Sequence, residues 1–184
     1  MMHIMQLFFA VIFGFLSLAA HADNECTIVY GNDWAFLFTT PEKWSSACHL
    51  EGQAGVAVAL WPKNSTWKNS PAVMYINVSR KNGFSLEQFT EDELTRFRTE
   101  SPGLKVQVSE PIPLKNHGQA LVRELANDQY GNHELVAYAN AGKVYLIFVL
   151  TSRNKEAFDQ FHSAFKELVT SMSPMKIEFK KAPN

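Results

Sequence analysis

The alternation of apolar and polar positions along the chain predicts many short strands and two long helices. Apolar or alternating segments bounded by Gly, Pro, Asn or Asp are typical of strands. They occur at residues 27–30, 34–39, 56–61, 73–79, 105–109, 119–127, 133–140 and 143–151. Short links containing glycine join the last three segments, which indicates antiparallel hairpins.

Two other segments repeat apolar residues every three or four positions, the period of a helix packed on one face. The first begins after Ser85, which with Gln88 has the spacing of a capping box, and the second after Asn154, a suitable N-cap. Their apolar positions are Leu86, Phe89, Leu94 and Phe97, and then Phe158, Phe161, Phe165, Leu168 and Met172.

The segment 144–150 is apolar at every position, so it requires cover on both faces of its sheet. We therefore expect an α+β fold in which an antiparallel β-sheet is flanked by two main helices on opposite faces, an α/β/α sandwich. Residues 23–184 have a length typical of one domain, and we predict a single one.

The order of these elements is similar to that of the PsbP-like family, which includes the DcrB-like periplasmic proteins. The matching residues are Phe36 to Thr40 with Pro41 and Trp44, Ser85 to Phe89, Gly118, Tyr145 to Thr151, Phe158, Phe165, Leu168, Ser171 and Met172. The resemblance implies an antiparallel sheet between helices and an accessory or binding role. It supplies no catalytic signature, so no site residue is transferred from it.

The chain starts with the features of a secretory signal. A mostly apolar stretch from Leu7 to Ala20 ends in Ala20-His21-Ala22, the small-x-small pattern at which signal peptidase cleaves. This predicts a signal peptide over residues 1–22 and a periplasmic or secreted protein with no stable membrane insertion after cleavage. Because Met1 to Gln6 contains no Lys or Arg, an uncleaved N-terminal anchor is the alternative.

Charge argues against nucleic acid as a partner. The chain has 17 basic and 18 acidic residues, a formal net charge of −1, which gives no general attraction to a polyanion.

Cys26 and Cys48 are the two cysteines of the chain. In an oxidising compartment, two cysteines in a small exported protein most simply form one disulfide. The alternative is that Cys48, next to His49, is a thiol nucleophile.

No catalytic or metal-binding motif is complete, so we expect no enzyme, no metal site and no cofactor. Ser85 lacks the second glycine of a nucleophile turn and is better explained as a helix cap. His133-Glu134 begins like a zinc-protease motif, but Ala137 occupies the position of the second histidine.

The loop 63–71 is the best candidate for partner binding. Trp67 lies there among polar residues, with Lys63 and Lys68 close in sequence, and tryptophan is common at binding hot spots. The alternative is that Trp67 folds back over the edge of the sheet.

Together these features predict an exported, non-enzymatic accessory protein that binds another envelope or secreted protein. A carrier or sensor of a small apolar ligand, held between sheet and helix, is the alternative. A third hypothesis is an unrecognised hydrolase or metal-binding protein.

Overall fold

The computed structural model describes residues 26–48, 55–115 and 118–175. The predicted signal peptide, residues 1–22, lies outside the described residues. The same is true of His49, His117 and the tail 176–184.

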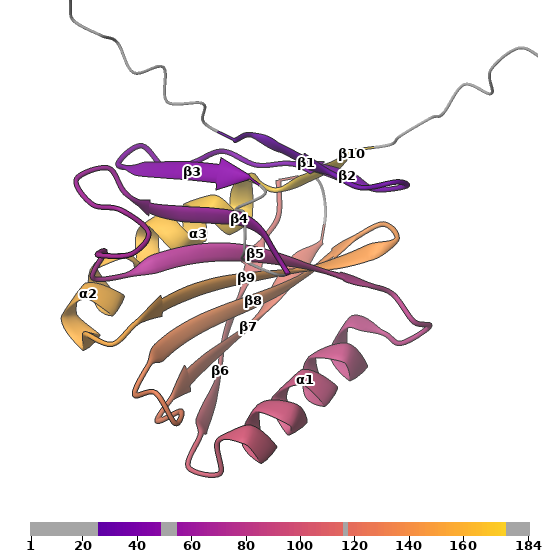
Figure 1. The fold of residues 1–184 in the computed structure, drawn as a ribbon. Helices are drawn as coiled ribbons and strands as arrows, with labels where there is room; N and C mark the ends of the chain where they lie inside the picture. Colours follow the sequence, from indigo (N-terminus) through magenta and orange to yellow (C-terminus); the bar gives the residue numbers. More distant parts are fainter. Residues whose placement is uncertain (1–25, 49–54, 116–117, 176–184) are drawn as a thin grey trace, which may run out of the picture.

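A seven-stranded antiparallel sheet forms the centre of the molecule, with the strand order β3-β4-β5-β9-β8-β7-β6 (Figure 1). Its strands are β3 (Trp44–Cys48), β4 (Val56–Pro62), β5 (Val73–Arg80), β6 (Lys105–Pro113), β7 (Gln119–Ala126), β8 (His133–Ala141) and β9 (Val144–Ser152). The predicted β7-β8-β9 hairpins are confirmed, because β8 pairs antiparallel with both of its neighbours in sequence.

Helices cover both faces of this sheet, so the predicted α+β sandwich is confirmed. Helix α1 (Leu86–Glu100) lies on one face, and α2 (Lys155–Gln160) and α3 (His162–Ser171) lie on the other (Figure 1). The prediction of one long second helix is wrong. The Phe161 amide donates to the Phe158 carbonyl at 3.2 Å, and this tighter turn separates α2 from α3.

The core consists of two apolar clusters on opposite faces of the sheet. One joins the sheet to α2 and α3, with Phe148, Phe158 and Phe165 completely buried. The other joins it to α1, with Leu94 and Tyr138 almost completely buried. Strand β9 is buried at every position from Val144 to Leu150, as its continuous apolar sequence predicts.

A second, three-stranded sheet has the order β1-β2-β10 (Figure 1). It consists of β1 (Ile28–Tyr30), β2 (Ala35–Leu37) and β10 (Ser173–Met175), all antiparallel. Strands β1 and β2 were predicted, whereas β3 and β10 were not. Proline within a short segment argues against a strand, and in β10 pairing of Ser173 to Met175 with the distant β2 overrides that local signal.

Candidate functional site

A hollow of about 630 Å³ lies at one end of the main sheet, where the β4-β5 loop meets the β9-α2 loop. It is lined by Trp67, Lys68, Ser70, Pro71, Ala72, Val73, Asn132, Thr151, Ser152, Arg153 and Asn154. Three segments that are far apart in sequence therefore form its wall.

The β4-β5 loop has an ordered turn of its own. The Asn69 carboxamide oxygen accepts hydrogen bonds from the Thr66 amide at 2.7 Å and from the Thr66 hydroxyl at 2.9 Å. The Asn69 and Ser70 amides both donate to the Thr66 carbonyl. These bonds close a turn around Trp67 and Lys68, so both side chains are presented from a shaped backbone.

Trp67 folds back against the sheet, and its half-buried ring packs edge-on to Tyr75 of β5. The two ring centroids are 6.4 Å apart, with 76° between the ring planes. Burial raises the pKa of Tyr75 above its usual range, and the negative charge of Glu134 raises it further. Tyr75 is therefore a neutral support beneath the tryptophan at all physiological pH values.

The opposite wall is fixed by Ser152, which is 4% exposed. Its hydroxyl is 2.6 Å from the Pro71 carbonyl, to which it donates, and it accepts from the Asn154 amide at 2.9 Å. Asn154 in turn accepts from the Ala157 amide at 2.8 Å and caps α2, as the sequence predicts. One serine thus ties the loop before β5 to the start of α2, which makes the hollow a preformed feature.

The rim is basic, while a half-buried carboxyl group is bonded to one of the lining residues. Lys68 and Arg153 are both exposed and both line the hollow. Glu134 of β8 lies opposite Thr151 of β9 in the strand register. Burial raises the pKa of Glu134, the Thr151 hydroxyl bonded to it lowers the pKa, and the charge of Asp128 raises it again.

Of the predicted binding residues, Trp67 and Lys68 line the hollow, whereas Lys63 does not. Sequence reasoning missed the wall supplied by Asn132 and by Thr151 to Asn154. These residues are polar and occur at strand ends, where polar residues are ordinary, so no local signal distinguishes them.

The histidine and serine candidates for catalysis have structural roles. Ser85 accepts a hydrogen bond from the Gln88 amide at 3.2 Å within a complete capping box, as predicted. His133 packs on Phe158 with ring centroids 5.8 Å apart, while the adjacent Glu134 points to the other face of the sheet. Within residues 26–48, 55–115 and 118–175, no three His, Cys, Asp or Glu residues gather to hold a metal ion.

Cys26 and Cys48 lie at the separation of a disulfide pair, with 5.6 Å between their Cα atoms. The pair joins the segment before β1 to the end of β3. The structure therefore places the two cysteines at the distance that the predicted disulfide requires.

Comparison with known proteins finds no matching family model and no matching curated sequence. Several solved structures are similar, among them LpqN, PsbP (CyanoP) and PA94. The cell-envelope biogenesis protein LpqN of Mycobacterium tuberculosis is 9% identical over 84% of this chain and 87% of its own, with a TM-score of 0.53. Cyanobacterial PsbP (CyanoP) of Synechocystis is 15% identical over 80% and 92% of the two chains, with a TM-score of 0.48.

A third similar structure is PA94 of Pseudomonas aeruginosa, described as a protein of unknown function and putative regulator. It is 13% identical over 74% of this chain and 80% of its own, with a TM-score of 0.46. At these identities the likeness to LpqN shows a shared fold and nothing about function.

Proposed function

We propose that this chain is an exported, non-enzymatic accessory protein that binds another envelope or secreted protein in the hollow around Trp67. The observation that carries the proposal is the preformed shape of this site. An ordered turn presents Trp67 and Lys68 opposite a wall that Ser152 holds in place.

The chemistry of the hollow suits a short segment of a partner protein. The face of Trp67 offers apolar contact area with few side-chain degrees of freedom, and tryptophan and arginine are both enriched at hot spots. Lys68 and Arg153 on the rim would pair with carboxylates. The partner segment that fits best therefore has one large apolar side chain and an acidic residue beside it.

Export rests on the N-terminal sequence and on the cysteine pair. The apolar stretch from Leu7 to Ala20 has the length of a signal core, and disulfides persist in oxidising compartments. In the part of the chain that the structure describes, no helix is long and apolar enough to cross a membrane.

The absence of catalysis is proposed because the candidate groups have structural roles. Ser85 caps α1 and His133 packs against Phe158. The alternative is an apolar ligand held between sheet and helix. In the interior such a ligand would have to displace core side chains such as Phe148, Phe158 and Phe165, which are completely buried there.

Site-specific photocrosslinking in the source cells tests this proposal. A photoreactive residue replaces Lys68 and, as a matched control, the exposed Lys143 of the β8-β9 turn, at the opposite end of β9 from the hollow. We expect one protein to crosslink from position 68 and not from position 143. Trp67→Ala should weaken its binding about thirty-fold, the effect of losing a hot spot worth about 2 kcal/mol.

Because Trp67 packs on Tyr75, Arg153→Glu provides a second variant that leaves the sheet untouched. It should also weaken the crosslink, while thermal unfolding stays unchanged. Equal crosslinking from both positions, or full capture by both variants, would contradict the proposal.

A further inference from the structure

An exposed aromatic side chain is presented from an ordered backbone just before α1. Phe84 is 51% exposed, more than any other phenylalanine in the described part of the chain. Its backbone is held in place, because the Tyr145 hydroxyl donates to the Phe84 carbonyl and the next residue, Ser85, caps α1. A ring on a backbone that is already ordered loses little conformational entropy when it binds.

Carboxylates surround this ring. A hollow of about 360 Å³, which we call the Phe84 surface, is lined by the exposed residues Phe84, Glu87, Gln88, Glu91 and Asp92. Glu91 pairs with Arg123 at 3.4 Å. Glu87 and Asp92 form no ion pair among the described residues. The Phe84 surface therefore combines one large apolar side chain with two negative charges that have no cationic neighbour bonded to them.

These properties complement those of the hollow around Trp67. That hollow combines an aromatic ring with Lys68 and Arg153, neither of which forms an ion pair within the described part of the chain. Aromatic rings pack on one another, and the cations of one surface attract the carboxylates of the other. With a volume of about 630 Å³, the hollow is in the size range of sites that enclose a ligand group.

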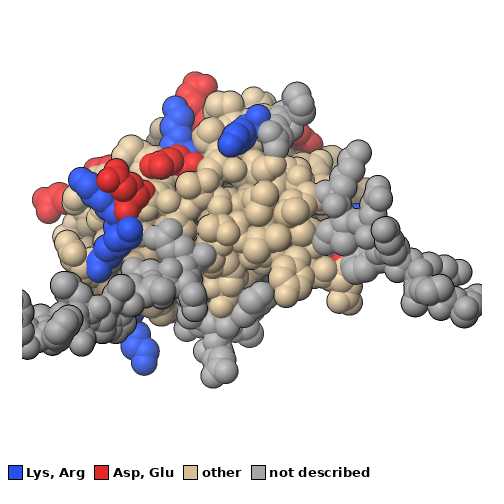
Figure 2. Space-filling view, turned by 90° about the horizontal axis from the view of Figure 1, so that it is seen from above, with Lys and Arg blue, Asp and Glu red and all other residues tan. Residues whose placement is uncertain are grey.

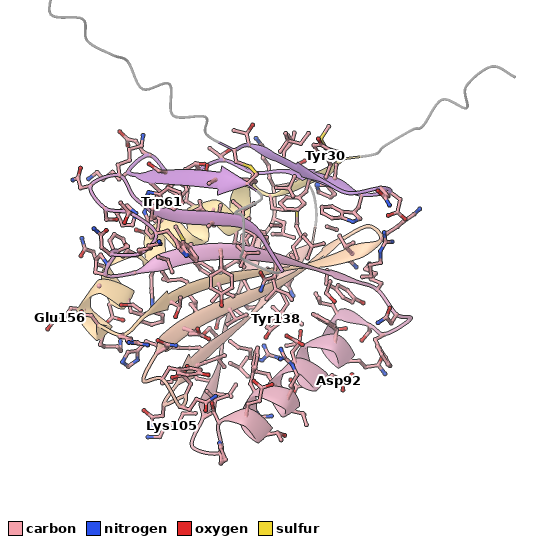
Figure 3. All side chains as sticks on the ribbon, in the orientation of Figure 1. Tyr30, Trp61, Asp92, Lys105, Tyr138 and Glu156 are labelled. Atoms are coloured by element: carbon pink, nitrogen blue, oxygen red, sulfur yellow. A yellow bond between two sulfur atoms is a disulfide. The ribbon has the colours of Figure 1, made fainter. Side chains whose placement is uncertain are left out.

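The two surfaces lie at opposite ends of the β5-β9 pair. At one end Val73 lies opposite Thr151, and both residues line the hollow. At the other end Arg80 lies opposite Val144, and the β5-α1 loop follows. The pairs between span roughly 24 Å at the standard strand rise. In Figure 1 the β4-β5 and β9-α2 loops lie at the left and the β5-α1 loop at the right, and Asp92 lies on α1 at the right in Figure 3.

This separation decides how the two surfaces can meet. They are too far apart to touch within one copy of the chain, whereas two copies arranged head to tail bring them together. The face of the molecule seen in Figure 2 has a different character, because its middle carries no charged side chain and acidic and basic side chains lie mixed toward its margin. A face of that kind does not complement the basic rim of the hollow.

We propose that the Phe84 surface of one copy of this chain docks into the hollow around Trp67 of a second copy. The Phe84 ring packs on Trp67, and the carboxylates of Glu87 and Asp92 pair with the two cations of the rim. The contact is heterologous, so it continues into chains of molecules unless it closes into a ring. This inference rests on the proposed function, because a second copy and the partner protein compete for the same hollow.

Sedimentation velocity of the purified protein over a range of concentrations tests the proposal. A contact built from one loop and the first turns of one helix is small, so we expect association that increases with protein concentration. Because the contact pairs opposite charges near the surface, added salt should weaken it. Phe84→Ser should weaken association about ten-fold or more, the effect of losing one buried aromatic side chain.

A second variant and a control accompany this measurement. Asp92→Lys reverses a charge at an exposed position of α1 and leaves the Phe84 ring in place, so it should also weaken association. Leu37→Ser is the matched control, since Leu37 is 39% exposed on the small sheet and lines neither surface. It should associate like the unaltered protein.

Mixing two variants tests the head-to-tail arrangement directly. Phe84→Ser retains an intact hollow, and Arg153→Glu retains an intact Phe84 surface. Each variant alone should stay monomeric, whereas an equimolar mixture should form a dimer. The dimer does not grow, because both of its free surfaces are the altered ones. A contact of the Phe84 surface with itself, or of the hollow with itself, gives no such rescue.

Four results would overturn the inference. They are a monomer at every concentration, unchanged association of Phe84→Ser, loss of association in Leu37→Ser, and a mixture of variants without a dimer. Photocrosslinking from position 68 separates this inference from the proposed function, because a second copy and a different protein differ in mass. Phe84→Ser that still captures the partner protein supports the proposed function alone, and a crosslink to a second copy alone supports only the inference.

Discussion

Several polar groups lie on the α1 face of the main sheet, where they have little contact with water. Tyr138 lies between the sheet and α1 (Figure 3), and burial raises its pKa above the usual range. Its hydroxyl and the carboxamide oxygen of Asn77 have no hydrogen-bond partner among the described residues. Glu134 is a half-buried carboxyl group on this face, and partial burial raises its pKa, so its ionisation is coupled to folding.

Replacing Glu134 with glutamine should stabilise the protein at neutral pH. Burial raises the pKa of Glu134 in the folded state above its ordinary value of 4.5. The folded protein then binds more protons than the unfolded chain just above pH 4.5, so its free energy of unfolding falls as pH rises through that window. We expect the gain from Glu134→Gln to disappear below about pH 4.5, measured by urea unfolding across the pH range.

Glu156→Gln in α2 is the control for this experiment, because Glu156 is exposed and the substitution makes the same chemical change away from the α1 face. A stability difference for Glu134→Gln that is constant with pH would show that ionisation of Glu134 is not the cause.

Among the elements, α1 depends most on its first turn and on one aromatic contact. Ser85 and Gln88 satisfy each other's amides in the capping box. Phe89 stacks on Tyr145 with ring centroids 4.8 Å apart and packs edge-on to Tyr138 at 6.2 Å. The Tyr145 hydroxyl also donates to the Phe84 carbonyl just before the helix. The cap fixes where α1 begins, and the aromatic contact fixes which face it covers.

Ser85→Ala should lower the free energy of unfolding by about 1 kcal/mol, because an amide of the first turn loses its partner. Amide exchange should accelerate in α1 and not in α3. Thr99→Ala is the control, since the exposed Thr99 hydroxyl only bonds to the Thr95 carbonyl of its own helix. Equal loss of stability in both variants would mean that the effect does not come from the cap.

At the scale of the whole molecule, a few specific links join the small sheet to the sandwich. The Cys26–Cys48 pair connects the start of the small sheet to β3. The Ser46 hydroxyl donates to the Cys26 carbonyl at 3.1 Å beside it, and the Thr39 amide donates to the Ser171 hydroxyl at 2.9 Å. These links hold the small sheet at a fixed position relative to the sandwich.

Replacing Cys26 and Cys48 together with alanine should lower the free energy of unfolding by about 3 kcal/mol. The bridged residues are 22 apart in sequence, and closing a loop of that length restricts the unfolded chain by about this amount. Urea unfolding measures the change, and the unaltered protein with a reducing agent should match the variant. Identical stability with and without the bridge would contradict this prediction.

Local patterns in the sequence are sufficient to predict the centre of the fold. The continuous apolar segment 144–150 predicts a strand covered on both sides, and the glycine-containing links predict its hairpin neighbours. The start of α1 at Ser85 follows from the capping spacing. These features depend on residues within a few positions of one another, so the sequence is informative without tertiary contacts.

Tertiary structure alone decides the features that join distant parts of the chain. Strand β10 exists because Ser173 to Met175 pair with Leu37 to Ala35, and the hollow exists because Ser152 reaches the loop that contains Trp67. The small sheet likewise combines both ends of the folded chain. The physical reason is the same in each case: pairing and burial between remote residues depend on how the chain folds back, and no local periodicity records that.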